Sequence, residues 1–262
     1  MAELARISRE GPVATVTMAR GDDHNAFNEH LISQLHDAFR SLASDEPVRV
    51  VVLAGEGKSF SAGADLDWMR RAASFSDEEN VRDAAAAAAL WRAIAECPKP
   101  VVARVHGNAL GGGAGLVAAS DIAIAAESAM FGFTEVRLGL VPATIAPHVI
   151  EKIGPGHALP LFLTGERFDA QRALMMGLVH QVVAPEQLEV AVGTVVDQLL
   201  SGGPQGQQSC KELVRRVAVE DRSKIDAYTA ALIASTRAGD EGREGVRAFL
   251  DKRKPDWLTQ AH

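Results

Sequence analysis

Three consecutive glycines, Gly111 to Gly113, have the type and spacing that most clearly indicate chemistry in this chain. They follow an apolar, β-branched run that ends at Val105, and they precede a helix of small residues predicted for 114–119. Glycine lets the backbone take a positive φ and lets a ligand approach it closely. A helix start presents unpaired N–H groups with partial positive charge. The stretch is therefore predicted to hold a negatively charged oxygen, either as a phosphate cradle or as an oxyanion hole.

The phosphate cradle has the weaker support. Gly113-Ala-Gly115-x-x-Ala118 matches the dinucleotide-binding pattern formally, but a lone match of this kind also arises from small-residue packing. Residues 106–110 separate the strand from the glycines, and the chain lacks the opening βαβ unit with its acidic ribose contact. The oxyanion hole needs a second donor from elsewhere in the chain.

A second glycine-rich loop, at residues 55–65 (GEGKSFSAGAD), offers that donor. It follows an apolar, β-branched run at 48–54 that predicts a buried strand. It precedes a helical segment predicted for 66–71. Two such strand–loop–helix turns on neighbouring strands would aim two backbone N–H groups at one point.

The rest of the chain supplies short strands followed by helices. Apolar spacing predicts an amphipathic helix at 28–43, and an alanine-rich helix at 78–97 is ended by two prolines. Strands are predicted at 4–9, 13–18, 121–125 and 179–183, extended structure at 131–139, helices at 145–153, 157–163 and 170–176, and almost continuous helix at 185–255. These elements recur as ββα units of unequal length, which indicates an α/β fold with an all-helical C-terminal part.

Composition narrows the class of protein. A chain of 262 residues with 47% hydrophobic residues suits one large domain, or a domain with an appendage. A net charge of −7 argues against nucleic acid as the main partner. The two cysteines, Cys97 and Cys210, are unpatterned, which favours a reducing compartment without a metal site. With no signal-peptide core and no apolar run long enough for a membrane span, we expect a cytoplasmic protein that does not bind membranes.

Taken together, the two loops resemble the enoyl-CoA hydratase/isomerase family, the crotonases. The resemblance rests on FSAGADLDWM at 60–69 with HGNALGGGAG at 106–115, and is supported by HNAF at 24–27, FGFTEVRLGLVP at 131–142 and AFLDKRKP at 248–255. It covers nearly the whole chain in the right order. Within the family, EVRLGLVPATIAPHVI at 135–150 is similar to the bacterial branch of methylglutaconyl-CoA or isohexenylglutaconyl-CoA hydratases.

The resemblance implies a crotonase-like spiral of ββα turns at 1–200 that holds the active site, and a helical region at 201–262 that forms trimers or hexamers. It implies an acyl-CoA thioester as substrate, with no cofactor beyond the coenzyme A of the substrate. The N–H groups of Ala64 and Gly112 would bind the thioester carbonyl. Further residues implied in binding coenzyme A or the acyl group are Lys58, Ala62, Asp65, Leu66, Trp68, Gly115, and, toward a neighbouring subunit, Phe249 and Lys252. For Asp65 a helix cap is the alternative, and for Trp68 a place in the core.

The chain departs from the family at one catalytic position. Hydratases of the family carry two glutamates, and the first lies three residues after the middle glycine of the turn, where this chain has Gly115. The second matches Glu135, which the resemblance makes the catalytic acid/base. Glycine at 115 is expected to leave an empty space for water or for a branched acyl group.

Three functions follow as alternatives. A hydratase, a lyase, would add water across the C2=C3 bond of a 2-enoyl-CoA, and a branched or glutaconyl-type acyl group is among the candidate substrates. An isomerase would move a proton from C2 to C4 with one base, for which Glu135 alone suffices. A crotonase-fold binding protein with little chemistry is the third. Because the chain resembles the hydratase branch, we predict the hydratase.

Overall fold

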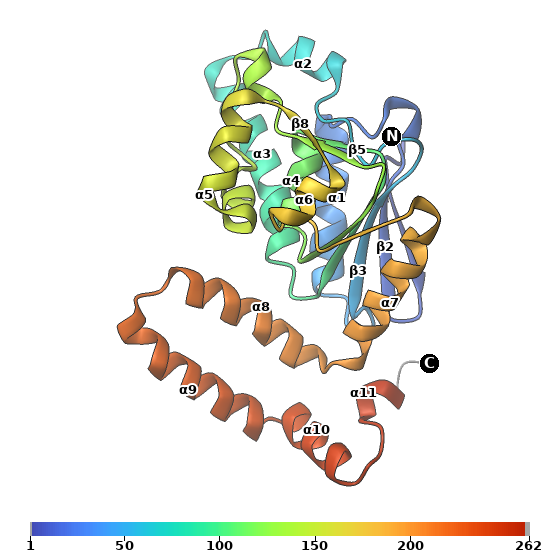
Figure 1. Ribbon diagram of the computed structural model, residues 1–262, viewed down its shortest axis with the longest axis vertical. Helices are drawn as coiled ribbons and strands as arrows, with labels where there is room; N and C mark the ends of the chain where they lie inside the picture. The colour runs from blue at the N-terminus through green and yellow to red at the C-terminus, as the bar shows by residue number, and fades with distance from the viewer. Residues whose placement is uncertain (1, 260–262) are drawn as a thin grey trace.

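The computed structural model, drawn as a ribbon in Figure 1, describes residues 2–259. Its main sheet has six strands in the order β1-β2-β3-β4-β6-β9. The hairpin of β1 and β2 is antiparallel and every other pair is parallel. The strands are β1 (Ala5–Glu10), β2 (Val13–Met18), β3 (Val50–Gly55), β4 (Val101–Val105), β6 (Ile122–Ala126) and β9 (Gln181–Val183).

A second sheet of three short strands lies at the carboxyl ends of the first. It consists of β5 (Asn108–Leu110), β7 (Met130–Gly132) and β8 (Arg167–Asp169), with β5 parallel to β7 and β7 antiparallel to β8. Each of two turns of the chain gives one strand to the main sheet, then one to the second sheet, then a helix: β4–β5–α4 and β6–β7–α5. The expected ββα pattern is confirmed.

Helices cover both faces of the main sheet. Residues of β3 alternate between the two faces: Val51 and Leu53 pack in the larger core, whereas Val50 and Val52 pack in the smaller one. The larger core is shared with α1 (Glu29–Ala43), α3 (Asp77–Ala95), α4 (Gly112–Ala119) and α5 (Ala146–Thr164), and the smaller core with α7 (Leu188–Ser201). The shorter helices are α2 (Leu66–Ala72), α6 (Ala170–Met175) and the 3-10 turns η1 (Gly21–Asp23), η2 (Glu135–Leu138) and η3 (Pro185–Gln187).

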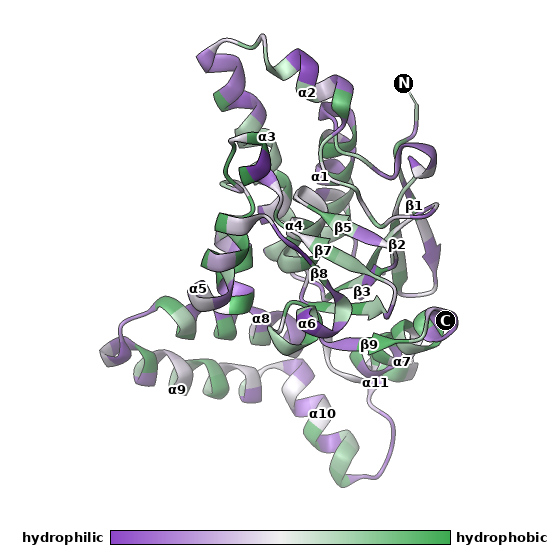
Figure 2. Ribbon diagram, turned by 45° about the horizontal axis from the view of Figure 1, so that its top comes forward, coloured by the Kyte–Doolittle hydropathy of each residue, from purple (hydrophilic) through white to green (hydrophobic). Residues whose placement is uncertain are grey.

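The C-terminal helices extend away from the sheet (Figures 1 and 2). They are α8 (Pro204–Val219), α9 (Arg222–Ala238), α10 (Asp240–Leu250) and α11 (Asp256–Thr259), and neither α8 nor α9 has a buried residue. Lys211 anchors α8 to the core, because its Nζ donates to the Asp121 carboxylate and to the Lys99 carbonyl. In the described part of the chain, no helix is both long and apolar enough to cross a membrane.

The structure differs from the predicted elements in several places. The stretch 131–139 is extended only in β7. At Glu135 the chain enters η2, which ends at Leu138 and is capped by Gly139 with φ 72°. Helix α4 begins at Gly112 rather than at residue 114, because Gly111 takes φ 51° and starts the helix earlier. Residues 108–110, for which no strand was predicted, form β5 because the partner strand β7 is supplied from elsewhere in the chain. The expected break between 153 and 157 is a kink of α5 at Gly154.

Candidate active site

The two glycine-rich loops lie side by side and are joined by backbone hydrogen bonds. The Ser61 amide donates to the Asn108 carbonyl, and the Leu110 amide donates to the Ser61 carbonyl, both at 2.9 Å. A Cβ on Gly113 would lie 2.7 Å from the Ser61 carbonyl oxygen, so only glycine permits this approach. The expectation that the two turns sit on neighbouring strands is confirmed, since β3 and β4 are paired.

The first candidate donor is the N–H of Ala64. The amides on either side are used within the chain: that of Ala62 donates to the His24 carbonyl at 3.0 Å, and that of Asp65 to the Phe27 carbonyl at 2.8 Å. Among the described residues the Ala64 amide donates to no acceptor, and Ala64 is exposed. Gly63, with φ 94°, turns the chain just before it. A backbone amide without an acceptor, in an exposed residue at a fixed turn, is available to a ligand.

The second candidate donor is the N–H of Gly112, the first residue of α4. Amides of a first helical turn have no acceptor within the helix and lie at its positive end. Two rings press against this glycine: a Cβ at position 112 would lie 3.1 Å from Phe27 Cδ2 and 3.4 Å from Trp91 Cη2. Phe27 and Trp91 pack edge to face with centroids 5.4 Å apart, which makes an apolar wall beside the amide.

Glu135 brings a carboxylate to the same point. It is the first residue of η2, and its Oε1 lies 3.2 Å from where a Cβ on Gly111 would be. Its Oε2 is buried, with no hydrogen-bond partner among the residues described. Burial raises the pKa of this carboxyl above its usual range, because the charged form is poorly solvated. A carboxyl whose pKa is raised toward neutrality is better suited than an ordinary glutamate both to take and to return a proton.

A scaffold of polar residues holds the donor loop, and sequence reasoning missed it. The side chain of Asn25, fully buried, donates to the carbonyls of Glu56 and Ser59 at 2.8 Å each. The Arg20 guanidinium donates to Asp65 at 2.9 Å, and Asp65 in turn accepts from the Trp68 amide at the start of α2. The helix-cap alternative for Asp65 is therefore confirmed. The signal was present as Asn25 in HNAF, but a buried amide is indistinguishable from a surface one in sequence.

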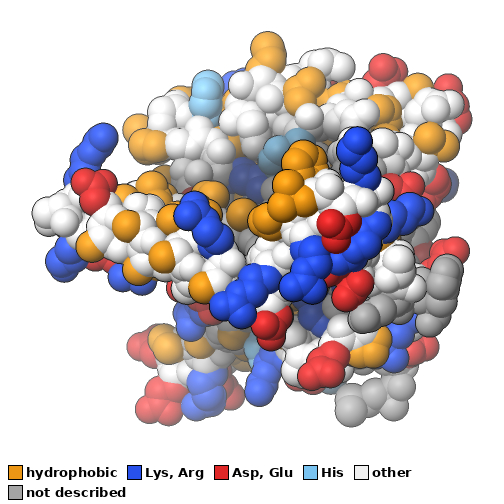
Figure 3. All heavy atoms as spheres, turned by 90° about the horizontal axis from the view of Figure 1, so that it is seen from below, with side chains coloured by type: hydrophobic (Ala, Val, Ile, Leu, Met, Phe, Trp, Pro, Cys, Tyr) orange, Lys and Arg blue, Asp and Glu red, His pale blue; other side chains and the backbone are white. Residues whose placement is uncertain are grey.

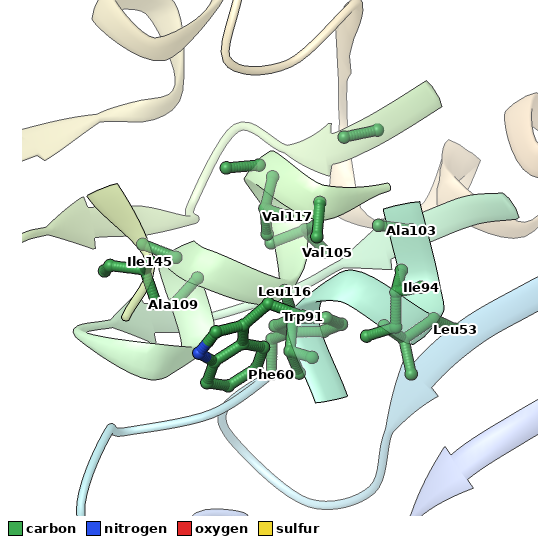
Figure 4. Close-up of a cluster of buried hydrophobic side chains, with 14 of the residues drawn as sticks. Leu53, Phe60, Trp91, Ile94, Ala103, Val105, Ala109, Leu116, Val117 and Ile145 are labelled. Carbon is green, nitrogen blue, oxygen red and sulfur yellow. The ribbon is translucent and has the colours of Figure 1, made fainter. Parts of the chain in front are cut away.

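The space expected beside Gly115 is not empty, and that expectation is wrong. A Cβ on Gly115 would lie 2.3 Å from Ile145 Cγ2 and 3.0 Å from Ile145 Cβ. Ile145, which immediately precedes α5, is only 2% exposed and belongs to the larger core (Figure 4). Gly115 thus accommodates a neighbouring side chain of the protein, and neither water nor an acyl branch fits there.

The other residues expected to bind substrate lie in two places. Lys58, Ala62, Leu66 and Trp68 belong to the donor loop and α2; Lys58 and Leu66 are exposed, and Ala62 and Trp68 are half-buried. Trp68 packs at the edge of the core and donates to Asp83 at 3.2 Å. Phe249 and Lys252 lie on and just after α10, at the opposite end of the molecule from α2 (Figures 1 and 2). Within one chain they do not approach the other site residues.

Comparison with known proteins identifies the class. Residues 8–260 match the family model described as enoyl-CoA hydratase/isomerase, so the chain belongs to that family. The fold is that of a crotonase. It is similar to the crystal structure of a putative enoyl-CoA hydratase/isomerase (crotonase) from Legionella pneumophila, with 42% identity, a TM-score of 0.92, and coverage of 97% of this chain and 98% of the other.

Two curated relatives extend the comparison. A putative enoyl-CoA hydratase of Thermus thermophilus is 34% identical, over 94% of this chain and 97% of the relative. A trans-2-decenoyl-[acyl-carrier-protein] isomerase of Streptococcus mutans is 31% identical, over 93% of each. The hydratase names among the relatives support enoyl-CoA hydratase activity, and with it an enzyme of the lyase type.

Proposed function

We propose that the protein hydrates 2-enoyl-CoA thioesters with one carboxylate, Glu135, and two backbone donors, the N–H groups of Ala64 and Gly112. One observation supports this proposal: three groups lie together at the two joined glycine loops. They are the Ala64 amide, which has no acceptor in the described chain, the Gly112 amide at the start of α4, and the Glu135 carboxyl, whose pKa is raised. Fixed donors of this kind contribute roughly 3–4 kcal/mol each to stabilising an oxyanion.

The reaction divides into two proton transfers through Glu135. The carboxylate takes a proton from water as the water oxygen bonds to C3, and the electrons of the C2=C3 bond shift to make an enolate whose charge rests on the thioester oxygen. The two N–H groups stabilise that charge. The proton then passes from Glu135 to C2, which restores the thioester carbonyl and the carboxylate. Water is added across the double bond and no other reactant is consumed.

The test is loss of the ultraviolet absorbance of the conjugated enoyl thioester when crotonyl-CoA is added. Glu135→Gln should lower kcat by roughly a hundredfold or more, the scale of a lost acid/base. Acetoacetyl-CoA should still bind to this variant in calorimetric titration, since the donors are backbone groups. Wild-type turnover without any effect of Glu135→Gln would refute the role of Glu135, and absence of thioester binding at millimolar ligand would refute the site.

Isomerisation of a 3-enoyl-CoA is the second candidate, and the single carboxylate is the observation that favours it. One base suffices to move a proton from C2 to C4, and one relative of this chain carries an isomerase name. The same absorbance measurement distinguishes the two activities. An isomerase raises the absorbance of a 3-enoyl-CoA as the conjugated double bond forms, and a hydratase lowers the absorbance of a 2-enoyl-CoA. Turnover of the 3-enoyl-CoA alone would assign the isomerase.

For the acyl group, we propose the methylglutaconyl type on the similarity of residues 135–150 to that branch. The space at Gly115 does not support it, because Ile145 fills that space. Rates on crotonyl-CoA and 3-methylglutaconyl-CoA compared under one set of conditions decide the matter. A higher kcat/KM for crotonyl-CoA would overturn the branch assignment.

The active unit is proposed to be a trimer or a pair of trimers in the cytoplasm. Exposed apolar side chains support it: Phe249 is 83% exposed, Leu250 71% and Ile233 56%. Figure 3 shows hydrophobic side chains gathered along the protruding helices. In such an assembly Phe249 and Lys252 would reach a neighbour's coenzyme A, while Lys58 and Ala62 would contact coenzyme A within the same chain. No cofactor is proposed beyond the coenzyme A of the substrate.

A further inference from the structure

Gly111, the residue before α4, and Gly115, in the first turn of α4, have different neighbours. A Cβ on Gly111 would point at the Glu135 carboxylate and lie 3.2 Å from its Oε1. A Cβ on Gly115, one turn further along the chain, would point at Ile145 and lie 2.3 Å from its Cγ2. The segment 135–145 packs against the first turn of α4. It presents a carboxylate, Glu135, to Gly111 and a hydrocarbon side chain, Ile145, to Gly115.

Ile145 is not free to move out of the way. It is 2% exposed, and its β-branched side chain has few rotamers. Its carbonyl accepts from the Val149 amide at 3.0 Å, and the neighbouring Thr144 hydroxyl accepts from Trp91 Nε1 at 3.3 Å. A carbon 2.3 Å from another is far inside the contact distance of packed atoms, about 3.5–4.0 Å. A side chain at position 115 therefore requires either a displaced α5 or a smaller residue at 145.

We propose that Ile145 confines the acid/base chemistry to Glu135, because it fills the space into which a second side chain, at position 115, would point. We call Gly115 and Ile145 an exclusive pair, because their side chains compete for one space. With isoleucine at 145 only glycine fits at 115, and an acidic residue at 115 fits only with a small residue at 145. This inference rests on the proposed role of Glu135 and concerns the number of acid/base groups that the site admits.

The first experiment measures stability in a cycle of Gly115→Glu, Ile145→Ala and the double variant. Gly115→Glu alone should lower Tm strongly through overpacking, and Ile145→Ala should lower it through a cavity. The double variant should be more stable than Gly115→Glu alone. The matched control is Val149→Ala, which removes a fully buried β-branched side chain one turn further along α5 and should not rescue Gly115→Glu. Wild-type stability of Gly115→Glu, or equal rescue by Val149→Ala, would overturn the proposal.

The second experiment measures kcat, and compares how much Glu135→Gln lowers it in two backgrounds. A change in packing alone would not alter that ratio. In the wild-type background, Glu135→Gln should lower kcat on crotonyl-CoA by roughly a hundredfold or more. In the background of Gly115→Glu with Ile145→Ala, the same change should cost less than about tenfold, because a second carboxylate can then carry the proton. An equal loss in both backgrounds would overturn the proposal. A wild-type enzyme that turns over no enoyl-CoA would instead refute the proposed function, and the stability cycle would still report on the exclusive pair.

Discussion

The carboxylate of Glu135 lies against the backbone of Gly111, so closely that a Cβ on Gly111 would be 3.2 Å from Oε1. Gly111 also takes φ 51° and ψ −120°, a conformation that favours glycine, and thereby starts α4 at Gly112. One glycine therefore sets both the direction of a helix-start N–H and the position of the carboxylate beside it.

The first prediction concerns Gly111→Ala. The added methyl group should push the Glu135 carboxylate away and strain the turn, so we expect kcat to fall at least about tenfold, since small misplacements of a reacting group are costly. The control is Gly11→Ala in the turn between β1 and β2, which also has positive φ (52°) but no atom within 4 Å of the added Cβ. Gly11→Ala should cost about 1–2 kcal/mol of stability for the left-handed backbone and leave kcat closer to wild type. Equal losses of kcat in both variants would contradict the role of Gly111.

The second prediction is that Glu135→Gln stabilises the protein at neutral pH. Burial raises the pKa of Glu135 in the folded state above its ordinary value of 4.5. Between that ordinary value and the raised one, the folded state binds the proton and the unfolded state does not. The free energy of unfolding then falls as pH rises through this window. Gln removes the penalty, so the variant should gain over wild type at pH 8 in urea denaturation, with little difference near pH 4.

The control for the pH effect is Glu166→Gln. A hydrogen bond from Arg172 lowers the pKa of Glu166, so its contribution has the opposite sign: it is present above the ordinary pKa and is lost as pH falls. Glu166→Gln should therefore give no gain in stability at pH 8. A Glu135→Gln variant that is less stable than wild type at pH 8 would show that the carboxylate is better solvated than its unpartnered Oε2 indicates.

The third prediction concerns the ion pair of Arg20 with Asp65, which holds the residue directly after the donor Ala64. The side chains are 12% and 17% exposed and their charged atoms are 2.9 Å apart. Arg20→Met should lower the free energy of unfolding by about 1–3 kcal/mol, less than for a fully buried pair. It should also lower kcat more than it changes KM, because the Ala64 amide loses its support.

The matched control is Asp67→Asn, which breaks the exposed pair of Asp67 with Arg70 on the same helix. Exposed pairs contribute roughly 0–1 kcal/mol, so both stability and kcat should stay near wild type. Steady-state kinetics with crotonyl-CoA and thermal denaturation measure both. A wild-type kcat in Arg20→Met would show that the backbone alone holds the amide in place.

The fourth prediction concerns the assembly. Static light scattering at micromolar concentration should give the mass of three or six chains, and Phe249→Asp should lower that mass, because a charge at a buried contact is costly. The control is Val190→Asp, an exposed apolar residue of α7 (63% exposed) that lies on the core rather than on the C-terminal helices. It should leave the trimer intact. A monomeric wild-type protein would contradict the proposed assembly.

Much of the fold was predictable because it follows from local patterns. Runs of β-branched and other apolar residues predicted the buried strands β3 and β4, since strands covered on both faces are apolar at nearly every position. In β4 the exception is Arg104, which is half-buried. Apolar spacing gave α1 with its buried face, and glycines after two strands marked the two loops. The candidate donors follow from these glycines, because the requirement for close approach is local.

What the tertiary structure decided depends on residues distant in sequence. Strand β5 exists because β7 pairs with it, and Glu135 lies on a 3-10 turn because the chain must turn at Gly139 toward α5. The neighbour of Gly115 could not be read from the chain either: a glycine in sequence looks like empty space, and only packing shows that Ile145, thirty residues later, occupies it. Sequence determines where a side chain is missing, whereas close packing of the folded chain determines what fills its place.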